Sequence, residues 1–182
     1  MKFEELPATI RGRKAERAVS LWLQSLGWYV LPAYDYAGLG EGKAPRLEGP
    51  QPAVVPDLLT ARDGAGRWCE VKFKQHADWT RATGRYETGI PTRHWLDYGR
   101  VRTITGTDVW LMFVHEDEDE IRGGEIDYLS RAWCAHGSDA FPILREYEGD
   151  RMSSGGMTFF CWKCLAPLAR TSDVLALQPV PA

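Results

Sequence analysis

The first regular pattern along the chain is that of an amphipathic helix. Apolar residues recur every three or four positions from Ala15 to Leu26, a spacing that places them on one helical face. Thr9 is expected to cap the start of this helix, and Gly27 is expected to end it. Residues 28–36 (WYVLPAYDY) then predict a first strand.

A hairpin follows after a break in the pattern. Residues 37–53 are rich in glycine and proline, and a connection of that length inside a compact domain is usually functional or mobile. Two short strand-like segments come next, at 54–61 and 66–74. Asp63–Gly64 between them is a strong hairpin signal.

The rest of the chain predicts one more helix and several strands. The helix is expected at 91–105, and the strands at 107–115, 123–130 and 157–165. The order α-β-β-β-α-β, with extra C-terminal strands, predicts an α/β fold with a mixed sheet. We expect residues 1–182 to form a single domain with a core at about 8–130. Residues 131–182 are then a C-terminal elaboration whose role the sequence does not assign.

Composition limits the class of protein. The chain has 182 residues, of which 44% are hydrophobic and 26% charged, as in an ordinary soluble domain. No apolar run approaches the roughly 18–20 residues of a membrane span, and the N-terminus does not resemble a secretory signal. The four cysteines are too scattered for a disulfide scaffold. We therefore expect a cytoplasmic protein with no membrane partner.

Charge is distributed unevenly along the chain. Residues 1–104 hold 16 Lys and Arg against 12 Asp and Glu, whereas residues 105–182 hold 6 against 13. The net charge of −3 therefore leaves room for a polyanionic partner, because binding depends on the local field. The acidic run 116–120 is expected to be a solvated loop between strands rather than a metal site.

The predicted hairpin gathers charged residues on one face. With Asp63–Gly64 as the turn, Asp57 lies opposite Glu70; with a turn one residue later, Asp57 lies opposite Lys72. Side chains alternate along a strand, so either register places these three residues on the same face. Two carboxylates within about 5–8 Å suit Mg²⁺ or Mn²⁺. Such an ion would polarise a phosphodiester oxygen and activate water, and the lysine would stabilise the transition state. The alternative is a surface ion pair worth under ~1 kcal/mol.

These residues resemble a known nuclease signature. Pro56–Asp57, twelve further residues and then Glu70–Val71–Lys72 are similar to the motif of the PD-(D/E)xK nuclease superfamily. The opening helix with Glu16 is similar to that of the compact Holliday junction resolvases of this superfamily. The resemblance covers roughly residues 8–115. The long segment before the aspartate and residues 131–182 have no counterpart in the resolvase pattern.

The resemblance implies a restriction-endonuclease-like mixed sheet flanked by helices, and a role for each motif residue. Asp57 and Glu70 would be metal ligands, Lys72 the catalytic lysine and Glu16 an accessory ligand, with the carbonyl of Val71 also facing the metal. The implied activity is Mg²⁺- or Mn²⁺-dependent hydrolysis of DNA by an endonuclease. The resemblance also implies that the enzyme acts as a homodimer, as many such enzymes do. Enzymes of this kind occur in bacteriophage and in prokaryotic recombination or defence. For Glu16 the alternative is an acid that complements the helix dipole.

Basic and aromatic residues are interleaved around the motif. Residues 62–102 hold nine Lys and Arg against five acids, together with five Trp and Tyr residues that could stack on bases. Trp95 is expected in the core, whereas Trp79 is open to either role. His94 is expected on the helix surface, the alternative being a contact to phosphate. The candidates for contacts to DNA are Arg13, Lys74, Arg81, Arg85 and Arg93.

A zinc site is the remaining candidate. Cys134-Ala135-His136 and Cys161-x-x-Cys164 contain ligand types that zinc accepts. The segment FFCWKC has a strand pattern, however, which would place its two cysteines on opposite faces. The strand pattern therefore argues against a shared site, and the sequence does not decide whether these residues bind zinc.

The sequence thus predicts a DNA endonuclease, possible substrates being a four-way junction, a flap, a single strand or a duplex. The alternatives are a non-catalytic nucleic-acid-binding module on the same fold and a structural protein with a zinc-tied C-terminal segment. The intact motif of Asp57, Glu70 and Lys72 argues for the enzyme.

Overall fold

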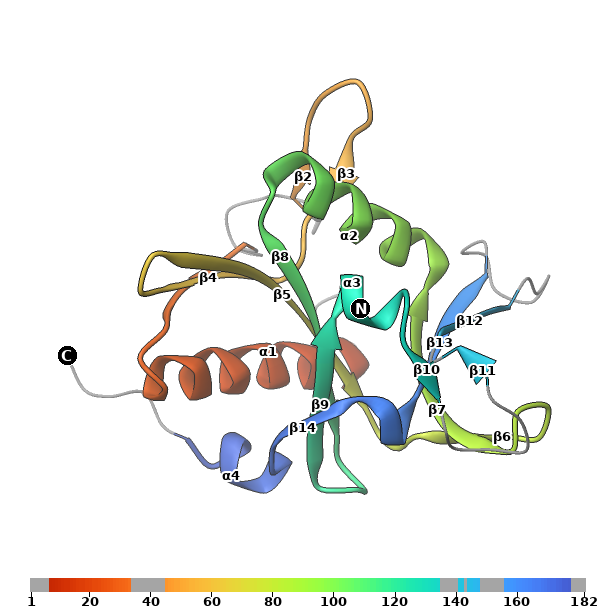
Figure 1. Ribbon diagram of the computed structural model, residues 1–182. Helices are drawn as coiled ribbons and strands as arrows, with labels where there is room; N and C mark the ends of the chain where they lie inside the picture. Colours follow the sequence, from red (N-terminus) through yellow and green to blue (C-terminus); the bar gives the residue numbers. More distant parts are fainter. Residues whose placement is uncertain (1–6, 34–44, 135–140, 143, 148–155, 178–182) are drawn as a thin grey trace.

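A mixed six-stranded sheet forms the centre of the described structure (Figure 1). The computed structural model describes residues 7–33, 45–134, 141–142, 144–147 and 156–177. In spatial order the strands are β1 (Tyr29–Pro32), β4 (Leu58–Arg62), β5 (Ala65–Lys74), β8 (Asp108–His115), β9 (Glu120–Glu125) and β14 (Ala166–Ala169). β5 and β8 run parallel, and every other neighbouring pair is antiparallel.

Two helices cover opposite sides of this sheet, as Figure 1 shows. The helix α1 (Pro7–Ser25) buries its apolar stripe against Val71 of β5 and neighbouring strand residues. The helix α2 (Thr92–Thr105) packs Tyr98 and Val101 into a separate cluster of buried side chains, which includes Leu111 and Phe113 of β8. Both predicted helices are confirmed, but α1 begins at Pro7, so Thr9 lies in its first turn instead of capping it.

The hairpin of β4 and β5 has the register that the two-residue turn predicts. Asp63 and Gly64 both have positive φ, 52° and 79°, which the tight turn requires and which these residue types tolerate. Arg62 pairs with Ala65, and Leu58 pairs with Cys69. Because Asp57 directly precedes Leu58, it lies opposite Glu70, as expected for this register.

A second sheet packs beside the first and leads into α2. Its order is β12 (Leu144–Tyr147), β13 (Met157–Cys161), β7 (Arg85–Pro91) and β6 (Asp78–Thr80). The sequence pattern gave no sign of β6 and β7, because the buried positions of β7 include the polar residues Arg85, Glu87 and Thr88. Arg85 and Arg145 neutralise the fully buried Glu87, so a charged sequence forms an interior strand.

Several shorter elements differ from the expected boundaries. Within the predicted irregular segment 37–53, β2 (Arg46–Leu47) and β3 (Ala53–Val54) form a small ladder, and residues 34–44 lie outside the described part. The predicted strand 123–130 is wrong in its second half, where α3 (Ile126–Leu129) follows β9. The other elements are β10 (Trp133–Cys134), β11 (Phe141–Pro142), the 3₁₀ helix η2 (Trp162–Cys164) and α4 (Thr171–Leu175). The acidic run is a turn between β8 and β9, as predicted, although Glu120 already belongs to β9.

Among the described helices, none combines the length and the hydropathy that a membrane span requires.

Candidate active site

The main chain holds Asp57 between β1 and β5. Its carbonyl oxygen accepts a hydrogen bond of 2.8 Å from the N–H of Ala33, just after β1. Its side-chain Oδ2 accepts one of 2.8 Å from the N–H of Val71 in β5. Asp57 is 5% exposed. The aspartate is therefore fixed beside the middle residue of the Glu-Val-Lys segment.

Glu70 and Lys72 form an ion pair on the same face of β5. The pair joins Nζ of Lys72 to Oε1 of Glu70, and the side chain of Glu70 is only 1% exposed against 29% for Lys72. The pair is thus largely buried, so the alternative of a surface ion pair does not describe it. The second oxygen of Glu70, Oε2, is buried and has no hydrogen-bond partner among the described residues. A buried carboxylate oxygen without a donor is costly, and a bound cation would satisfy it.

Glu16 joins the two hairpin acids from α1. It is half-buried and lies on the helix that packs against β5. Burial raises its pKa, the charge of Lys72 lowers it and the charge of Glu70 raises it, with a net increase. A cavity of about 230 Å³ is lined by both Glu16 and Asp57. The structure therefore brings Glu16 and Asp57 to one cavity, and the role of Glu16 as an accessory metal ligand stays a prediction.

The site carries more acids than bases in a poorly solvated position. Burial raises the pKa of Asp57 well above its usual range, and the negative charge of Glu70 raises it further. Lys72 and the Val71 hydrogen bond act in the opposite direction and do not offset these effects. Burial lowers the pKa of Lys72, but Glu70 and Asp57 outweigh it, so the lysine stays charged. Three carboxyl groups face Lys72 and Arg13, which also lines the cavity and lowers the pKa of Glu16. The remaining negative charge suits a hard divalent ion, which prefers oxygen ligands.

His94 is a further residue beside the site, where the sequence indicated a helix surface position. It lies in the first turn of α2 and is half-buried, with Nδ1 3.5 Å from the hydroxyl oxygen of Tyr98. Burial lowers its pKa, and the positive charge of Lys72 lowers it further. Helix α2 packs against β8, the neighbour of β5, and this tertiary contact, which no local pattern predicts, brings His94 within range of the charge of Lys72.

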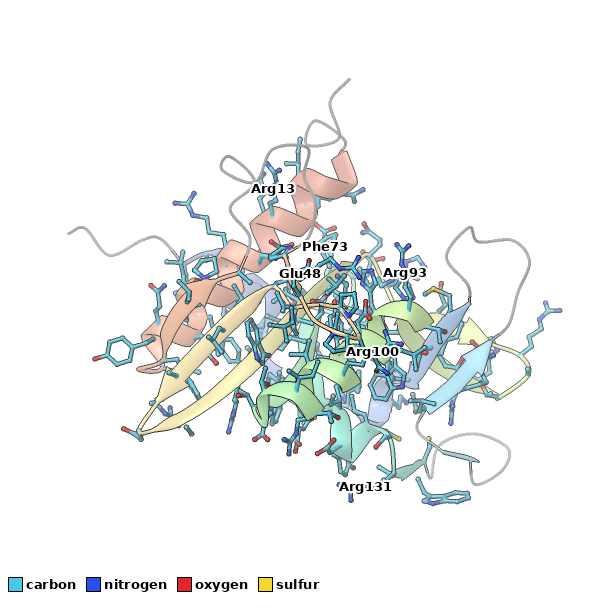
Figure 2. All side chains as sticks on the ribbon, turned by 90° about the horizontal axis from the view of Figure 1, so that it is seen from above. Arg13, Glu48, Phe73, Arg93, Arg100 and Arg131 are labelled. Carbon is cyan, nitrogen blue, oxygen red and sulfur yellow. The ribbon has the colours of Figure 1, made fainter. Side chains whose placement is uncertain are left out.

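The predicted DNA contacts have different surroundings. Arg13 projects from α1 and Arg93 from α2 on the face shown in Figure 2, and Arg93 is exposed. Arg81 is exposed in the turn after β6, and Lys74 is half-buried at the end of β5. Arg85 is different: it is 3% exposed, and its Nε donates a hydrogen bond of 2.9 Å to Glu87. The structure thus places Arg85 in the interior, where it cannot reach a phosphate.

Two of the aromatic candidates are exposed together. Trp79 of β6 and Tyr86 of β7 lie edge to face, with ring centroids 5.1 Å apart, and are 56% and 47% exposed. Trp95 instead packs against Phe160 in the core, as predicted, with centroids 5.4 Å apart. The pair on β6 and β7 therefore remains available to stack on a base, whereas Trp95 does not.

Comparison with known proteins identifies the fold. No family model matches the chain, and neither does any curated protein sequence. Among solved structures, Hjc, a Holliday junction resolvase of the archaeal hyperthermophile Archaeoglobus fulgidus, aligns with a TM-score of 0.52 and 10% identity over 90% of this chain and 99% of Hjc. The bacterial homing endonuclease I-Ssp6803I aligns with a TM-score of 0.38 and 18% identity over 68% of each chain. D212, a nuclease from a fusselovirus, aligns with a TM-score of 0.46 and 12% identity over 93% of this chain and 94% of D212.

The likeness to Hjc concerns the fold. It covers nearly the whole of both chains at a sequence identity of 10%. The protein therefore shares the compact fold of Hjc, and the predicted restriction-endonuclease-like mixed sheet flanked by helices is confirmed.

Proposed function

We propose that this chain is a metal-dependent DNA endonuclease whose active site consists of Asp57, Glu70, Lys72 and Glu16. The observation that carries the proposal is the buried Oε2 of Glu70, which has no hydrogen-bond partner in the described structure and lies in a cluster of acids beside a single lysine. A structural ion pair would not require Asp57 and Glu16 in addition, because Lys72 alone neutralises Glu70.

The oxygen donors of the cluster fit Mg²⁺ or Mn²⁺. Asp57, Glu70 and Glu16 would hold the ion, and water would complete its coordination. The carbonyl of Val71 would join them: its N–H points to Asp57, and the N–H and carbonyl of a strand residue point to the same side. When bound, the ion supplies positive charge that polarises a phosphodiester oxygen and lowers the pKa of the attacking water.

The protein's own residues have separate roles. Lys72 is charged and anchored by Glu70, so its ammonium can hold the attacking water and stabilise the negative charge of the transition state. Asp57 is fixed by a backbone hydrogen bond, which keeps the ligand set in place without substrate. Arg13, Lys74, Arg81 and Arg93 would contact phosphates, which position the nucleic acid without reading its sequence.

The fold also supports a narrower substrate. Hjc, which shares it, is a Holliday junction resolvase, and we propose that branched DNA is the substrate here and that two chains act together so that each cuts one strand. The test is incubation with labelled four-way junction, flap, single-stranded and duplex DNA of one sequence, with Mg²⁺, Mn²⁺ or EDTA. We expect metal-dependent cleavage, fastest on the junction. Faster cleavage of flap or single-stranded DNA would overturn the junction preference alone.

Tight binding without cleavage under every metal condition would overturn the nuclease proposal in favour of a non-catalytic nucleic-acid-binding module. The same panel in RNA form tests whether the sugar matters, because the 2′-hydroxyl is what distinguishes RNA from DNA at a given site. Equal cleavage of the RNA panel would contradict DNA as the specific substrate.

A further inference from the structure

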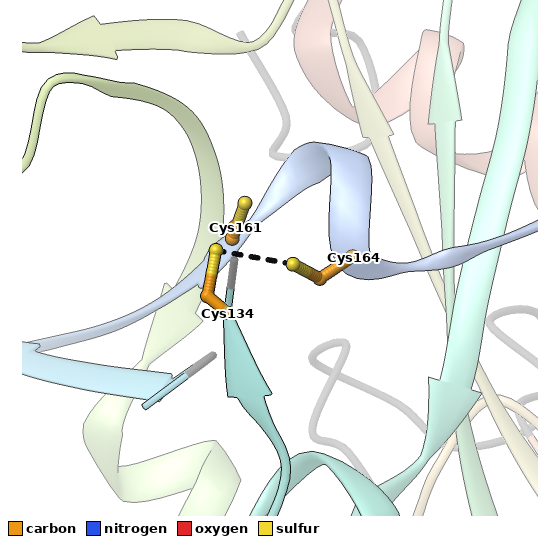
Figure 3. Close-up of side chains that lie close together, drawn as sticks. All are labelled: Cys134, Cys161 and Cys164. Carbon is orange, nitrogen blue, oxygen red and sulfur yellow. Dashed lines mark hydrogen bonds between the residues drawn. The ribbon is translucent and has the colours of Figure 1, made fainter. Parts of the chain in front are cut away.

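Three cysteines from separate elements meet at one point outside the proposed active site (Figure 3). Cys134 lies in β10, Cys161 ends β13 and Cys164 ends η2. Their sulfur atoms all lie within 4.8 Å of one another, and the thiol of Cys164 donates a hydrogen bond of 3.1 Å to Sγ of Cys134. In the described part of the chain, none of the three forms a disulfide bond.

The sequence pattern placed Cys161 and Cys164 on opposite faces because it extended the strand through both. The structure ends β13 at Cys161, and the 3₁₀ helix that follows turns the chain back. The turn closes with the N–H of Leu165 donating a 3.2 Å hydrogen bond to the carbonyl of Trp162. A turn of this kind brings residues three positions apart to the same side, so the expectation against a shared site is wrong.

The cluster has the geometry of a zinc site. Zinc–sulfur bonds of about 2.3 Å in a tetrahedron place ligand sulfurs about 3.8 Å apart. The observed separations, one of 3.1 Å and all within 4.8 Å, lie around this value, so small side-chain movements suffice. Cys134 and Cys161 are each 1% exposed, so they are shielded from solvent as in structural zinc sites. Thiolates are soft ligands, which select zinc over magnesium.

The surroundings offer a compensating charge. Burial lowers the pKa of Arg85, but the hydrogen bond and charge of Glu87 and the nearness of Cys134 and Cys161 outweigh this effect and raise it. Glu87, which accepts a hydrogen bond from Arg85, pairs with Cys161 across β7 and β13, so this guanidinium lies on the strand beside the cysteines. This gives the buried arginine, which the sequence assigned to DNA, a different place in the molecule.

We propose that Cys134, Cys161 and Cys164 bind one Zn²⁺ ion that stabilises the C-terminal elaboration. The ion would tie β10 to the end of β13 and to η2, residues separated by up to 30 positions along the chain. It would thereby hold the second sheet against the segment that leads into β14 at the edge of the central sheet. His136, two residues after Cys134, lies outside the described residues, and no step of the proposal depends on it.

Metal analysis of the whole chain tests the proposal. The protein would be expressed with zinc in the medium, freed of any histidine tag and analysed for metal by mass spectrometry under reducing conditions. We expect one equivalent of zinc per chain. Replacement of zinc by cobalt should give the visible bands of tetrahedral cobalt and a thiolate-to-cobalt charge-transfer band. Removing zinc with a chelator should lower the melting temperature, and zinc, but not Mg²⁺, should restore it.

Single substitutions locate the ion. Cys134→Ser and Cys164→Ser should lose most of the bound zinc and weaken the charge-transfer band. Cys69→Ser is the matched control, since Cys69 is a free, buried cysteine in the other side-chain cluster, and it should keep one equivalent. If the variants fail to fold, the cobalt spectrum of the wild-type protein still decides.

The absence of both zinc and the charge-transfer band in reduced wild-type protein would overturn the proposal. A disulfide between Cys134 and Cys164 in protein purified without reductant would also overturn the proposal, provided that the same protein takes up no zinc after reduction. Neither result bears on the nuclease proposal, because the active site uses oxygen ligands.

Discussion

The backbone N–H of Val71 donates a 2.8 Å hydrogen bond to the carboxylate of Asp57. This single contact joins the two halves of the motif, since Val71 stands between Glu70 and Lys72 in β5 while Asp57 precedes β4. Because it uses the main chain of Val71, it fixes the position of the aspartate independently of which side chain residue 71 carries. The contact also holds the carboxylate of Asp57 beside the strand segment that carries Glu70 and Lys72.

Asp57→Asn and Glu70→Gln should each abolish cleavage while DNA binding is kept or becomes tighter. Each change removes a charged oxygen ligand of the proposed metal site but no phosphate-binding cation. The measurement is single-turnover cleavage, with binding followed separately in EDTA. Asp63→Asn is the control: Asp63 lies in the exposed hairpin turn, where asparagine also tolerates the positive φ of 52°. Normal cleavage by either active-site variant would contradict the assignment.

Lys72→Met should lower the rate of the chemical step by about 10²–10³-fold, as expected on loss of one preorganised electrostatic donor. It should also lower the melting temperature, because the nearly inaccessible Glu70 loses its partner. Lys72→Arg keeps the charge and should melt close to wild type yet still cleave slowly, since a guanidinium presents its donors differently. Cleavage by Lys72→Arg at the wild-type rate would indicate that only the charge matters. Normal cleavage by Lys72→Met would remove the residue from the mechanism.

Without metal, the protein should become less stable as the pH rises. The folded-state pKa of Asp57 is raised above its unfolded value, so the folded protein keeps a proton that the unfolded chain has released. This contribution to stability is fully present below the ordinary aspartate pKa of about 4 and is lost as the pH rises through the raised value. The raised pKa of Glu16 acts in the same direction. Melting in EDTA from about pH 5 to about pH 9 measures the effect.

An asparagine at position 57 carries no charge at any pH, so Asp57→Asn should reduce the loss of stability with rising pH. Added Mg²⁺ should stabilise the wild-type protein more at high pH, because the ion competes with the proton for the same oxygens. Parallel pH profiles for the wild type and Asp57→Asn would show that this carboxyl group has an ordinary pKa.

Arg93→Ala should weaken binding to all DNA substrates alike and reduce the slope of affinity against salt by about one phosphate contact. Arg93 is exposed on α2, on the same face as Arg13 in Figure 2. Arg131→Ala is the matched control, since Arg131 is also exposed but lies at the opposite end of that view. Titrations at several salt concentrations provide the comparison. An equal loss of affinity in the two variants would mean that general charge, rather than a defined contact, accounts for binding.

Arg85→Ala should affect folding rather than DNA contacts. It leaves Glu87 buried with one cation fewer, and breaking a buried ion pair costs about 3–5 kcal/mol. Chemical denaturation should show this loss, whereas Arg81→Ala, at an exposed position, should unfold like the wild type. Unchanged stability of Arg85→Ala would mean that Arg145 alone neutralises Glu87.

Local sequence rules were sufficient for the helix α1 and for the hairpin. The three-and-four spacing from Ala15 to Leu26 predicts a helix wherever one face can be buried. Asp63–Gly64 adopts the left-handed conformations of a two-residue turn, and this fixes the register that sets Asp57 against Glu70. The alternation of side chains then places Lys72 on the same face. The core of the candidate site could therefore be predicted from a few neighbouring residues.

The partners of that core depended on long-range packing. The sequence pattern gave no sign of β7, and Glu87 can be buried there because Arg145, 58 positions later in the chain, neutralises it. His94 comes within range of the charge of Lys72 because α2 packs against β7 and β8. The three cysteines meet because β13 ends one residue before a 3₁₀ turn. The sequence by itself determined features whose energetics are local: helix periodicity, turn conformation and side-chain alternation. The tertiary structure decided which charges are buried and which distant residues meet, because both depend on neighbours that only folding brings together.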